Sequence, residues 1–224
     1  MVSMDFRKFY DKTATSYDKR HDSPASLMLR KKENGLIKKY ATGRVLDIGC
    51  GTGYHMGHGE NIKNIIGVDI SDYMLKIARK RGFNVKKARA EDLPFQDNSF
   101  DTIFCFFAVL NMCNSSQAVK EMARVLKPGG CALLSLSSIH DKQQFKISKQ
   151  IVQLKKLFTK AGLASLFEKN GLSLEHFDSM FRSGRRPRWG DFAPIPLKER
   201  ISLWLDRFRS QENGVIYMVV FRKR

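Results

Sequence analysis

The sequence lacks the features that would place a chain in a membrane, in an oxidising compartment or around a structural zinc ion. Its apolar runs fall short of the roughly 20 residues that a bilayer-spanning helix needs, and its first residues, MVSMDFRKFYDK, carry charges where a secretory leader would be apolar. The four cysteines, Cys50, Cys105, Cys113 and Cys131, include no C-x-x-C pair. We therefore expect a cytoplasmic chain with reduced thiols, no bound metal and no membrane span.

Acidic residues are also scarce. The 224 residues include 40 of Lys and Arg against 22 of Asp and Glu, a formal net charge of +18. A surplus of this size favours a polyanionic partner such as nucleic acid, and solvated basic faces on a soluble protein are the alternative interpretation. The 42% hydrophobic content is enough for a sizeable core, in one domain, one domain with a lobe, or two small domains.

Apolar strand patterns alternate with amphipathic helical ones in the first 140 residues. The expected strands are residues 44–48, 64–69, 85–88, 100–109 and 131–138. The expected helices between them are residues 71–81, with Ser71 as a possible N-cap, and 116–126. This alternation predicts βαβ units and an α/β fold with a mostly parallel sheet.

The pattern changes after about residue 140. The expected elements there are a basic helix at residues 142–169 that is interrupted at Gly162, a strand at 172–177, a loop at 182–190, a helix at 197–208 and a final strand at 215–221. High β-propensity marks the final strand. One sheet with a helical insertion before its last strand accounts for this order.

A glycine-rich segment, DIGCGTG at residues 47–53, follows the first strand directly. Ligands of open α/β sheets bind beyond the carboxyl ends of the strands, and glycines let the backbone approach them. The spacing is G-x-G-x-G, and Tyr54 stands where a nicotinamide-binding fingerprint has its third glycine. The segment therefore predicts a ligand site, and the spacing disfavours a dinucleotide.

Two further acidic positions fall at the ends of strands. Asp69 ends the second strand, where a carboxylate can accept hydrogen bonds from two ribose hydroxyls. The segment AEDLPF at residues 90–95 follows the third strand, where an acid can accept from an adenine amino group and Leu93 can pack on the ring. The set favours an adenosine-containing ligand.

With these motifs the chain resembles the class I S-adenosylmethionine-dependent methyltransferases of the type 11 group. The segments that carry the resemblance are VLDIGCGTG, IIGVDIS, AEDLPF, FDTIFCFFAVLN and RVLKPGG, over about residues 40–138. The resemblance implies a Rossmann-like, seven-stranded, mostly parallel sheet with helices on both faces, an antiparallel last strand and S-adenosylmethionine as cofactor. It divides the chain into an N-terminal helical lid at residues 1–43, a cofactor-binding core at 44–140, and a basic helical insertion with the C-terminal strands at 141–224.

The resemblance also implies roles for individual residues. Asp47 and the glycines would hold the methionine part of the cofactor, Asp69 the ribose, residues 91–93 the adenine, and Phe106 and Phe107 would lie beneath the sulfonium. The complete set of implied cofactor-binding residues is Tyr17, Asp47, Gly49, Cys50, Gly51, Gly53, Asp69, Ile70, Met74, Glu91, Asp92, Leu93, Phe106 and Phe107.

The pairs Tyr10-Asp11 and Tyr17-Asp18 look like lid residues of the same family, and simple packing of the tyrosines is the alternative. Methyl transfer needs chiefly an in-line arrangement of donor and nucleophile, and the sequence offers no acid–base pair at fixed spacing. Tyr17 and His140 are the candidates for a catalytic proton acceptor, against a packing or surface role for each.

Two acceptor classes remain open. The short segment at residues 54–64 resembles that of tRNA wobble-uridine carboxymethyl methyltransferases, although Asn111-Met112 stands where these carry paired histidines. Seven basic residues and no acid lie between Lys76 and Arg89. A second basic group, suited to phosphates and base stacking, comprises Arg182, Arg185, Arg186, Arg188 and Trp189. These features lean toward tRNA or another RNA. The alternative is a small, quinone-like molecule, because the Tyr-Asp pairs also resemble quinone methyltransferases.

Overall fold

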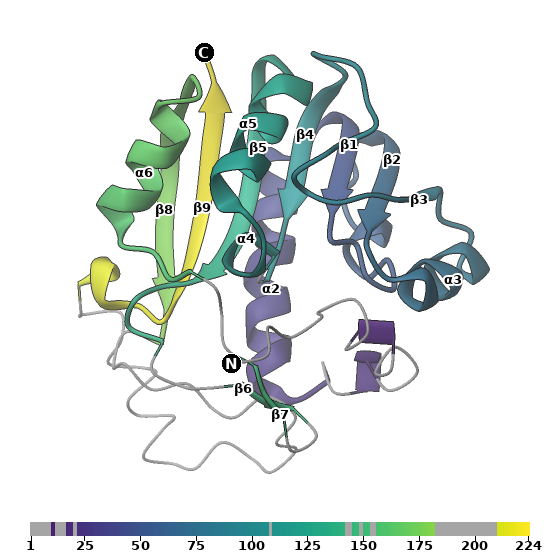
Figure 1. Cartoon of the computed structure of the whole chain (residues 1–224), viewed down its shortest axis with the longest axis horizontal. Coiled ribbons are helices and arrows are strands. Elements are labelled where there is room, and N and C mark those ends of the chain that lie inside the picture. The colour runs from purple at the N-terminus through teal and green to yellow at the C-terminus, as the bar shows by residue number, and fades with distance from the viewer. Residues whose placement is uncertain are drawn as a thin grey trace.

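The computed structural model describes residues 10–11, 17–19, 22–107, 109–141, 145–147, 150–152, 156–181 and 210–224. Its main sheet has the order β3-β2-β1-β4-β5-β9-β8 (Figure 1). The strands are β1 (Gly43–Ile48), β2 (Ile62–Asp69), β3 (Val85–Lys87), β4 (Phe100–Cys105), β5 (Leu126–Ser137), β8 (Leu172–Met180) and β9 (Ile216–Lys223). Pairing is parallel from β3 to β5, and β9 is antiparallel to both β5 and β8. The predicted Rossmann-like sheet with an antiparallel last strand is confirmed.

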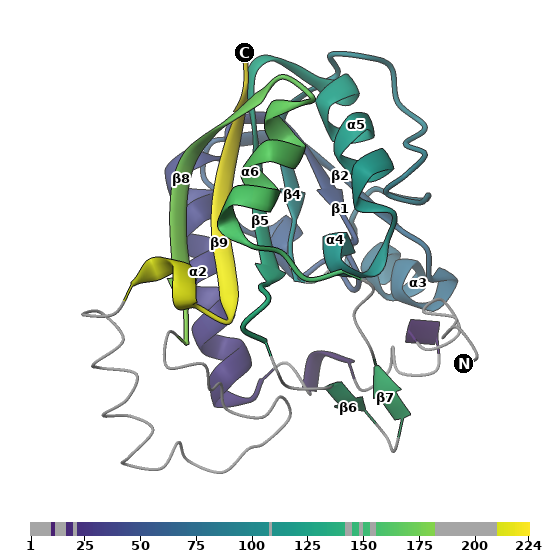
Figure 2. The ribbon, with the colours of Figure 1, turned by 60° about the vertical axis from the view of Figure 1, so that its left-hand side comes forward.

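Helices cover both faces of the sheet (Figure 2). On one face, α2 (Pro24–Tyr40) buries Leu29 and Ile37 against Phe104 and Val220. On the other, α5 (Ser115–Val125) and α6 (Lys160–Glu168) pack on the same strands, and the Phe167 ring of α6 is stacked on Phe221 with centroids 3.9 Å apart. Alternate residues of the central strands β1, β5 and β9 therefore point into two separate hydrophobic cores.

The helix α3 (Asp72–Lys80) begins as the sequence predicts. The Ser71 hydroxyl accepts a hydrogen bond from Met74 N at 3.2 Å and satisfies one of the free N–H groups of the first turn. Asp72 in the first turn and Arg79 and Lys80 in the last complement the helix dipole. Ile65 of β2 packs against both the cluster that contains the apolar side of α3 and the cluster that contains α2, so the two helices lie on the same side of the sheet.

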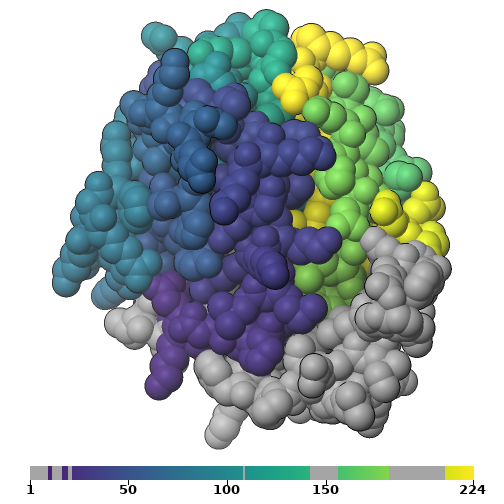
Figure 3. Space-filling model, turned by 180° about the vertical axis from the view of Figure 1, so that it is seen from behind, coloured from purple at the N-terminus to yellow at the C-terminus, as the bar shows by residue number. Residues whose placement is uncertain are grey.

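The crossover from β1 to β2 contains one short 3₁₀ helix, η1 (His55–Gly57), where a longer connection would carry an α-helix. A close approach shapes this region: a Cβ on Gly67 of β2 would lie 2.7 Å from Cys50 Sγ. In the view from behind, α2 runs across the middle of the molecular surface, and the residues of β2 and α3 lie beside it (Figure 3).

Three predicted elements differ from the structure. The strand predicted at residues 131–138 begins earlier, because β5 already starts at Leu126. The helix predicted at residues 142–169 is wrong over its first half, where β6 (Phe145–Ile147) and β7 (Gln150–Val152) form an antiparallel pair. The helix begins only after Thr159, whose hydroxyl accepts from Gly162 N. The predicted strand 100–109 ends at Cys105, because the chain turns into the short helix α4 (Val109–Met112). The predicted loop 182–190 and helix 197–208 lie outside the described residues.

Within the described part of the chain, no helix combines the length and hydropathy of a membrane span. The division of the chain into a lid, a core and a basic insertion stays a prediction.

Candidate functional site

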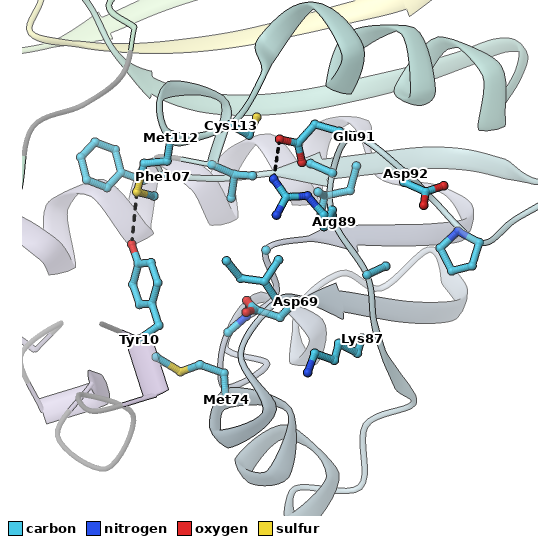
Figure 4. Close-up of a pocket in the computed structure, with 18 of the residues that line it drawn as sticks. Tyr10, Asp69, Met74, Lys87, Arg89, Glu91, Asp92, Phe107, Met112 and Cys113 are labelled. Atoms are coloured by element: carbon cyan, nitrogen blue, oxygen red, sulfur yellow. Dashed lines mark hydrogen bonds and ion pairs between the residues drawn. The ribbon is translucent and has the colours of Figure 1, made fainter. Parts of the chain in front are cut away.

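A cavity of about 740 Å³ lies at the carboxyl edge of the sheet (Figure 4). Its wall comes from the ends of β1 and β2, from the segment after β3, and from the segment that joins β4 to α5, with two N-terminal tyrosines closing one side. The lining residues are Tyr10, Tyr17, Ile48, Gly49, Gly51, Asp69, Ile70, Met74, Lys87, Ala88, Arg89, Ala90, Glu91, Asp92, Pro94, Phe107, Val109, Met112 and Cys113.

Asp69 stands at the end of β2 and anchors the cavity floor. Its Oδ2 accepts a hydrogen bond from Gly51 N and its Oδ1 accepts one from Ser71 N, both at 2.9 Å. Burial raises the pKa of Asp69, and the hydrogen bonds from the Ser71 and Gly51 amides oppose that shift. A carboxylate offers about four acceptor sites, so Asp69 keeps room for two ligand hydroxyls after binding these amides.

The glycine-rich loop presents backbone to the cavity. Gly49 and Gly51 have φ values of 74° and 53°, which side-chain-bearing residues seldom adopt. A Cβ on Gly49 would lie 2.2 Å from Val109 Cγ2. The loop therefore needs glycine at Gly49, where β1 meets the segment after β4.

Asp47 lies behind the loop with 2% of its surface exposed, and its Oδ2 has no hydrogen-bond partner within the described structure. Burial raises the pKa of Asp47 to about 7, with nearby His55 opposing the shift and Asp69 and Glu33 adding to it. Buried polar atoms are nearly always paired. An unpaired carboxylate oxygen in this position suits a cationic group, such as the ammonium of an amino acid.

The far end of the cavity carries alternating charges. Arg89 and Glu91 form an ion pair at 3.1 Å, and Glu91 Oε1 also accepts from Asn114 N at 3.0 Å. Figure 4 shows Asp92 to the right of this pair and Lys87 below it. Leu93 differs from its neighbours: it is buried in the core, and its N–H donates to Glu121 Oε2 at 2.8 Å.

The opposite end is aromatic and apolar. The Tyr10 hydroxyl donates to Met112 Sδ at 3.6 Å, and Figure 4 shows Phe107 beside this contact. The Tyr10 ring stands edge-to-face with Tyr17, with centroids 6.2 Å apart. Burial raises the pKa of Tyr17 far above its ordinary value, so its phenol is neutral near pH 7. This end suits a planar or apolar group.

The cavity brings together most of the residues that the sequence predicts for a cofactor site. Those that line it are Tyr17, Gly49, Gly51, Asp69, Ile70, Met74, Glu91, Asp92 and Phe107. The others lie behind the lining, and these are Asp47, Cys50, Gly53, Leu93 and Phe106. His140 also lies outside the lining, and its N–H donates to Ser138 Oγ. Arg182, Arg185, Arg186, Arg188 and Trp189 fall outside the described residues.

Several lining residues escape motif reasoning, among them Lys87, Arg89, Val109, Met112 and Cys113. They share one signal that the sequence does offer: each lies at or after the carboxyl end of β3 or β4. Ligand sites of α/β sheets form at this edge whatever the residue type.

Comparison with known proteins identifies the family. A sequence profile described as "Methyltransferase domain" matches residues 46–134. An uncharacterized protein of Methanocaldococcus jannaschii is 39% identical over 163 residues, which cover 71% of this chain and 75% of that protein. The ubiquinone/menaquinone biosynthesis C-methyltransferase of Geotalea daltonii is 35% identical over 143 residues, 58% of this chain and 61% of that protein. The chain belongs to the class I S-adenosylmethionine-dependent methyltransferases.

The family's cofactor, S-adenosylmethionine, is the cofactor of this chain. The chain spans 61% of the length of the Geotalea daltonii methyltransferase, and 54% of a second Methanocaldococcus jannaschii relative.

Solved structures share the fold over nearly the whole chain. A methyltransferase of Thermotoga maritima, described as a possible histamine N-methyltransferase, superposes with a TM-score of 0.70 at 24% identity, covering 97% of this chain and 99% of that one. A chain from the complex between the Haloferax volcanii Trm112 methyltransferase activator and a methyltransferase gives a TM-score of 0.70 at 19% identity, with 99% of each chain covered. At these identities the likeness concerns the fold.

Proposed function

We propose that this methyltransferase moves the methyl group of S-adenosylmethionine to a nucleophilic atom of an RNA, with tRNA as the first candidate. The observation that carries donor binding is Asp69, which sits at the end of β2 with acceptor capacity left and fixes the glycine loop through Gly51 N. The observation that favours RNA is the charge of +18 on 224 residues.

The residues fit the donor from end to end. Asp69 would accept the ribose hydroxyls, and the Glu91 end would face the adenine. The backbone of Gly49 and Gly51 would lie along the methionine part, and the unpaired Oδ2 of Asp47 would compensate its ammonium group. Tyr10, Tyr17 and Phe107 would cover the site from water.

The cofactor supplies a methyl group on a sulfonium, which is already a reactive electrophile. The chain's part is to hold the acceptor in line, with the reacting atoms about 3–3.5 Å apart, and to exclude water. The neutral phenol of Tyr17 can donate a hydrogen bond and cannot accept a proton at pH 7. The site therefore favours an acceptor that is nucleophilic without a strong base, such as a carboxylate.

Methyl transfer from labelled S-adenosylmethionine to unfractionated tRNA tests this proposal. We expect label in the RNA fraction, and nuclease digestion followed by mass spectrometry of the nucleosides would identify the methylated atom. An Asp69→Ala variant is the control that should lose the label.

A small aromatic acceptor is the second candidate. Curated relatives include quinone methyltransferases, such as the demethylmenaquinone methyltransferase of Chlorobaculum parvum at 33% identity over 139 residues. The apolar end formed by Tyr10, Phe107 and Met112 would suit a planar ring. Label in an organic-soluble demethylquinone, with none in tRNA, would favour this candidate over RNA.

A further inference from the structure

The charged residues on the solvent-exposed side of α2 are all basic. Its exposed charged residues are Lys31, Lys32, Lys38 and Lys39, and the other charged residues of the helix are buried. Lys32 pairs with Asp178 at 2.7 Å. The other three lysines form no ion pair with any residue that the structure describes. Two basic pairs thus stand seven residues apart, about 10 Å along the helix.

The neighbouring helix continues this charge. Lys76, Arg79 and Lys80 are exposed on α3, which packs on the same side of the sheet as α2. The short η1 crossover lies between the two helices, as Figure 3 shows from that side, and Glu60 is an exposed acid within it. We call the set Lys31, Lys38, Lys39, Lys76, Arg79 and Lys80 the basic face.

Gly35 lies between the two lysine pairs, at an exposed position in the middle of α2. A Cβ built there would meet no described atom within 4 Å, so packing does not require glycine. Glycine in a helix interior also lowers the stability of the helix. Glycine at this position therefore lowers the stability of the fold, and packing does not explain why it is there. Its missing side chain leaves a gap through which a bulky partner can reach the helix backbone.

The basic face begins beside the cavity. Residues 41–42 alone connect α2 to β1, so the helix runs antiparallel to that strand and its N-terminal end lies at the carboxyl edge of the sheet (Figure 1). At this end of α2, the Arg30 guanidinium lies 3.7 Å from the centroid of the Tyr54 ring. Tyr54 is the residue that directly follows the glycine-rich loop. A polyanion lying along α2 would therefore extend toward the edge of the sheet at which the cavity lies.

We propose that the basic face docks the phosphate backbone of the RNA acceptor, with Gly35 as the point of closest approach. The inference rests on the proposed function for the choice of RNA. A membrane surface fits less well, because Leu29, Leu36 and Ile37 of α2 are buried in the core, and the exposed Leu27 is a single apolar side chain on this helix. Each lysine that meets a phosphate releases counterions and makes the affinity dependent on salt.

The test measures the binding of unfractionated tRNA by fluorescence anisotropy at salt concentrations from roughly 50 to roughly 300 mM. Contacts between lysines and phosphates make the affinity fall steeply over this range. Lys31→Gln with Lys38→Gln should weaken binding about tenfold at low salt and reduce the slope of log Kd against log salt by about 1.4, as expected for two contacts to a single strand. The matched control is Lys120→Gln with Lys169→Gln. These two exposed lysines, on α5 and at the end of α6, belong to the opposite face and form no ion pair with described residues.

A Gly35→Gln variant separates docking from folding. Because glutamine favours a helix over glycine, the variant should melt at a higher temperature and yet bind tRNA about fivefold more weakly. An unchanged tRNA affinity in this variant would overturn the role of Gly35. Equal losses of tRNA affinity in the two lysine double variants would overturn the basic face as the docking site, while leaving RNA as the acceptor.

Calorimetry with S-adenosylmethionine is run in parallel. A wild-type protein that binds the donor but no tRNA would overturn the basic face and the RNA acceptor together, without touching the methyltransferase activity. Binding to vesicles of phosphatidylserine and phosphatidylcholine, stronger than to tRNA, would assign the face to a membrane and also overturn the proposal.

Discussion

Glu33 Oε2 lies 2.9 Å from His55 Nε2, which joins the buried side of α2 to the η1 turn behind the glycine loop. The other oxygen of Glu33 accepts a hydrogen bond from the Ser135 hydroxyl of β5. Ser135 Oγ in turn accepts from Phe107 N at 2.9 Å. One carboxylate with 2% exposure therefore connects α2, the crossover and the cavity wall.

Replacing this carboxylate should destabilise the fold. Glu33→Ala leaves Ser135 and His55 without their partner in a buried site, so we expect the free energy of unfolding to fall by about 2–4 kcal/mol. Glu33→Gln should recover more than half of that loss, since an amide can accept from Ser135 and donate to His55. Urea denaturation measures both, with the exposed Lys31→Ala as control. Equal stability of the Ala and Gln variants would contradict the hydrogen-bonding role.

Asp69→Ala should weaken S-adenosylmethionine binding by about 2–3 kcal/mol, roughly 30- to 150-fold, because hydrogen bonds to an ionised acceptor are lost. Calorimetry measures the affinity, and circular dichroism checks that the variant is folded. Asp178→Ala removes a carboxylate on β8, remote from the cavity, and should bind the donor as the wild type does. A twofold or smaller change in Asp69→Ala would argue against its role.

Asp47 should make stability fall as pH rises. Its pKa is about 7 in the folded chain and about 3.8 ordinarily, so between these values the folded state holds a proton that the unfolded state has lost. The stabilisation is complete below about pH 4 and is lost as pH approaches 7. Relative to Asp47→Asn, the wild type should lose roughly 2–3 kcal/mol of unfolding free energy between pH 5 and 8, measured with urea.

Donor binding should show the opposite dependence on pH. The ammonium group of S-adenosylmethionine would favour the charged form of Asp47, so affinity should rise between pH 5 and 7 and then level off. Calorimetry of Asp47→Asn over the same range should give a flatter profile. Parallel profiles for the two proteins would place the ammonium group elsewhere.

Gly67→Ala should cost about 1–3 kcal/mol of stability, because the new methyl group would lie 2.7 Å from Cys50 Sγ and 2.9 Å from Met56 Sδ. Gly57→Ala is the control, since its Cβ would meet Phe83 only at 3.9 Å. Thermal unfolding of the two variants compares them directly. Similar melting temperatures would mean that the crossover moves aside freely.

Much of the pattern between residues 44 and 140 is predictable because local signals and the parallel sheet agree. Ser71 starts α3 where a cap is expected, and the apolar run from Phe100 forms a strand buried on both faces. The error at residues 142–169 has a different cause. A basic segment with scattered apolar residues is compatible with a helix or a hairpin, and its partner strand, rather than its own pattern, decides between them.

The candidate site also contains residues that local sequence signals predict and residues that they do not. The glycine loop and Asp69 are identified by their places at strand ends, whereas Leu93 enters the core because Glu121, 28 residues further on, binds its N–H. No pattern near Leu93 announces that contact. Tyr10 and Met112 meet across 102 residues, a separation that motif spacing cannot bridge.

The position of β9 has a consequence for how the chain is made. This strand follows β8 in the chain, yet it lies between β5 and β8 and pairs with both along most of its length. While the chain is still emerging from the ribosome, β8 has no described strand to pair with, and Phe167 of α6 lacks the Phe221 ring on which it stacks. Folding of the sheet must therefore wait until β9 has left the ribosome, and a nascent chain would expose the unpaired edge of β5 until then.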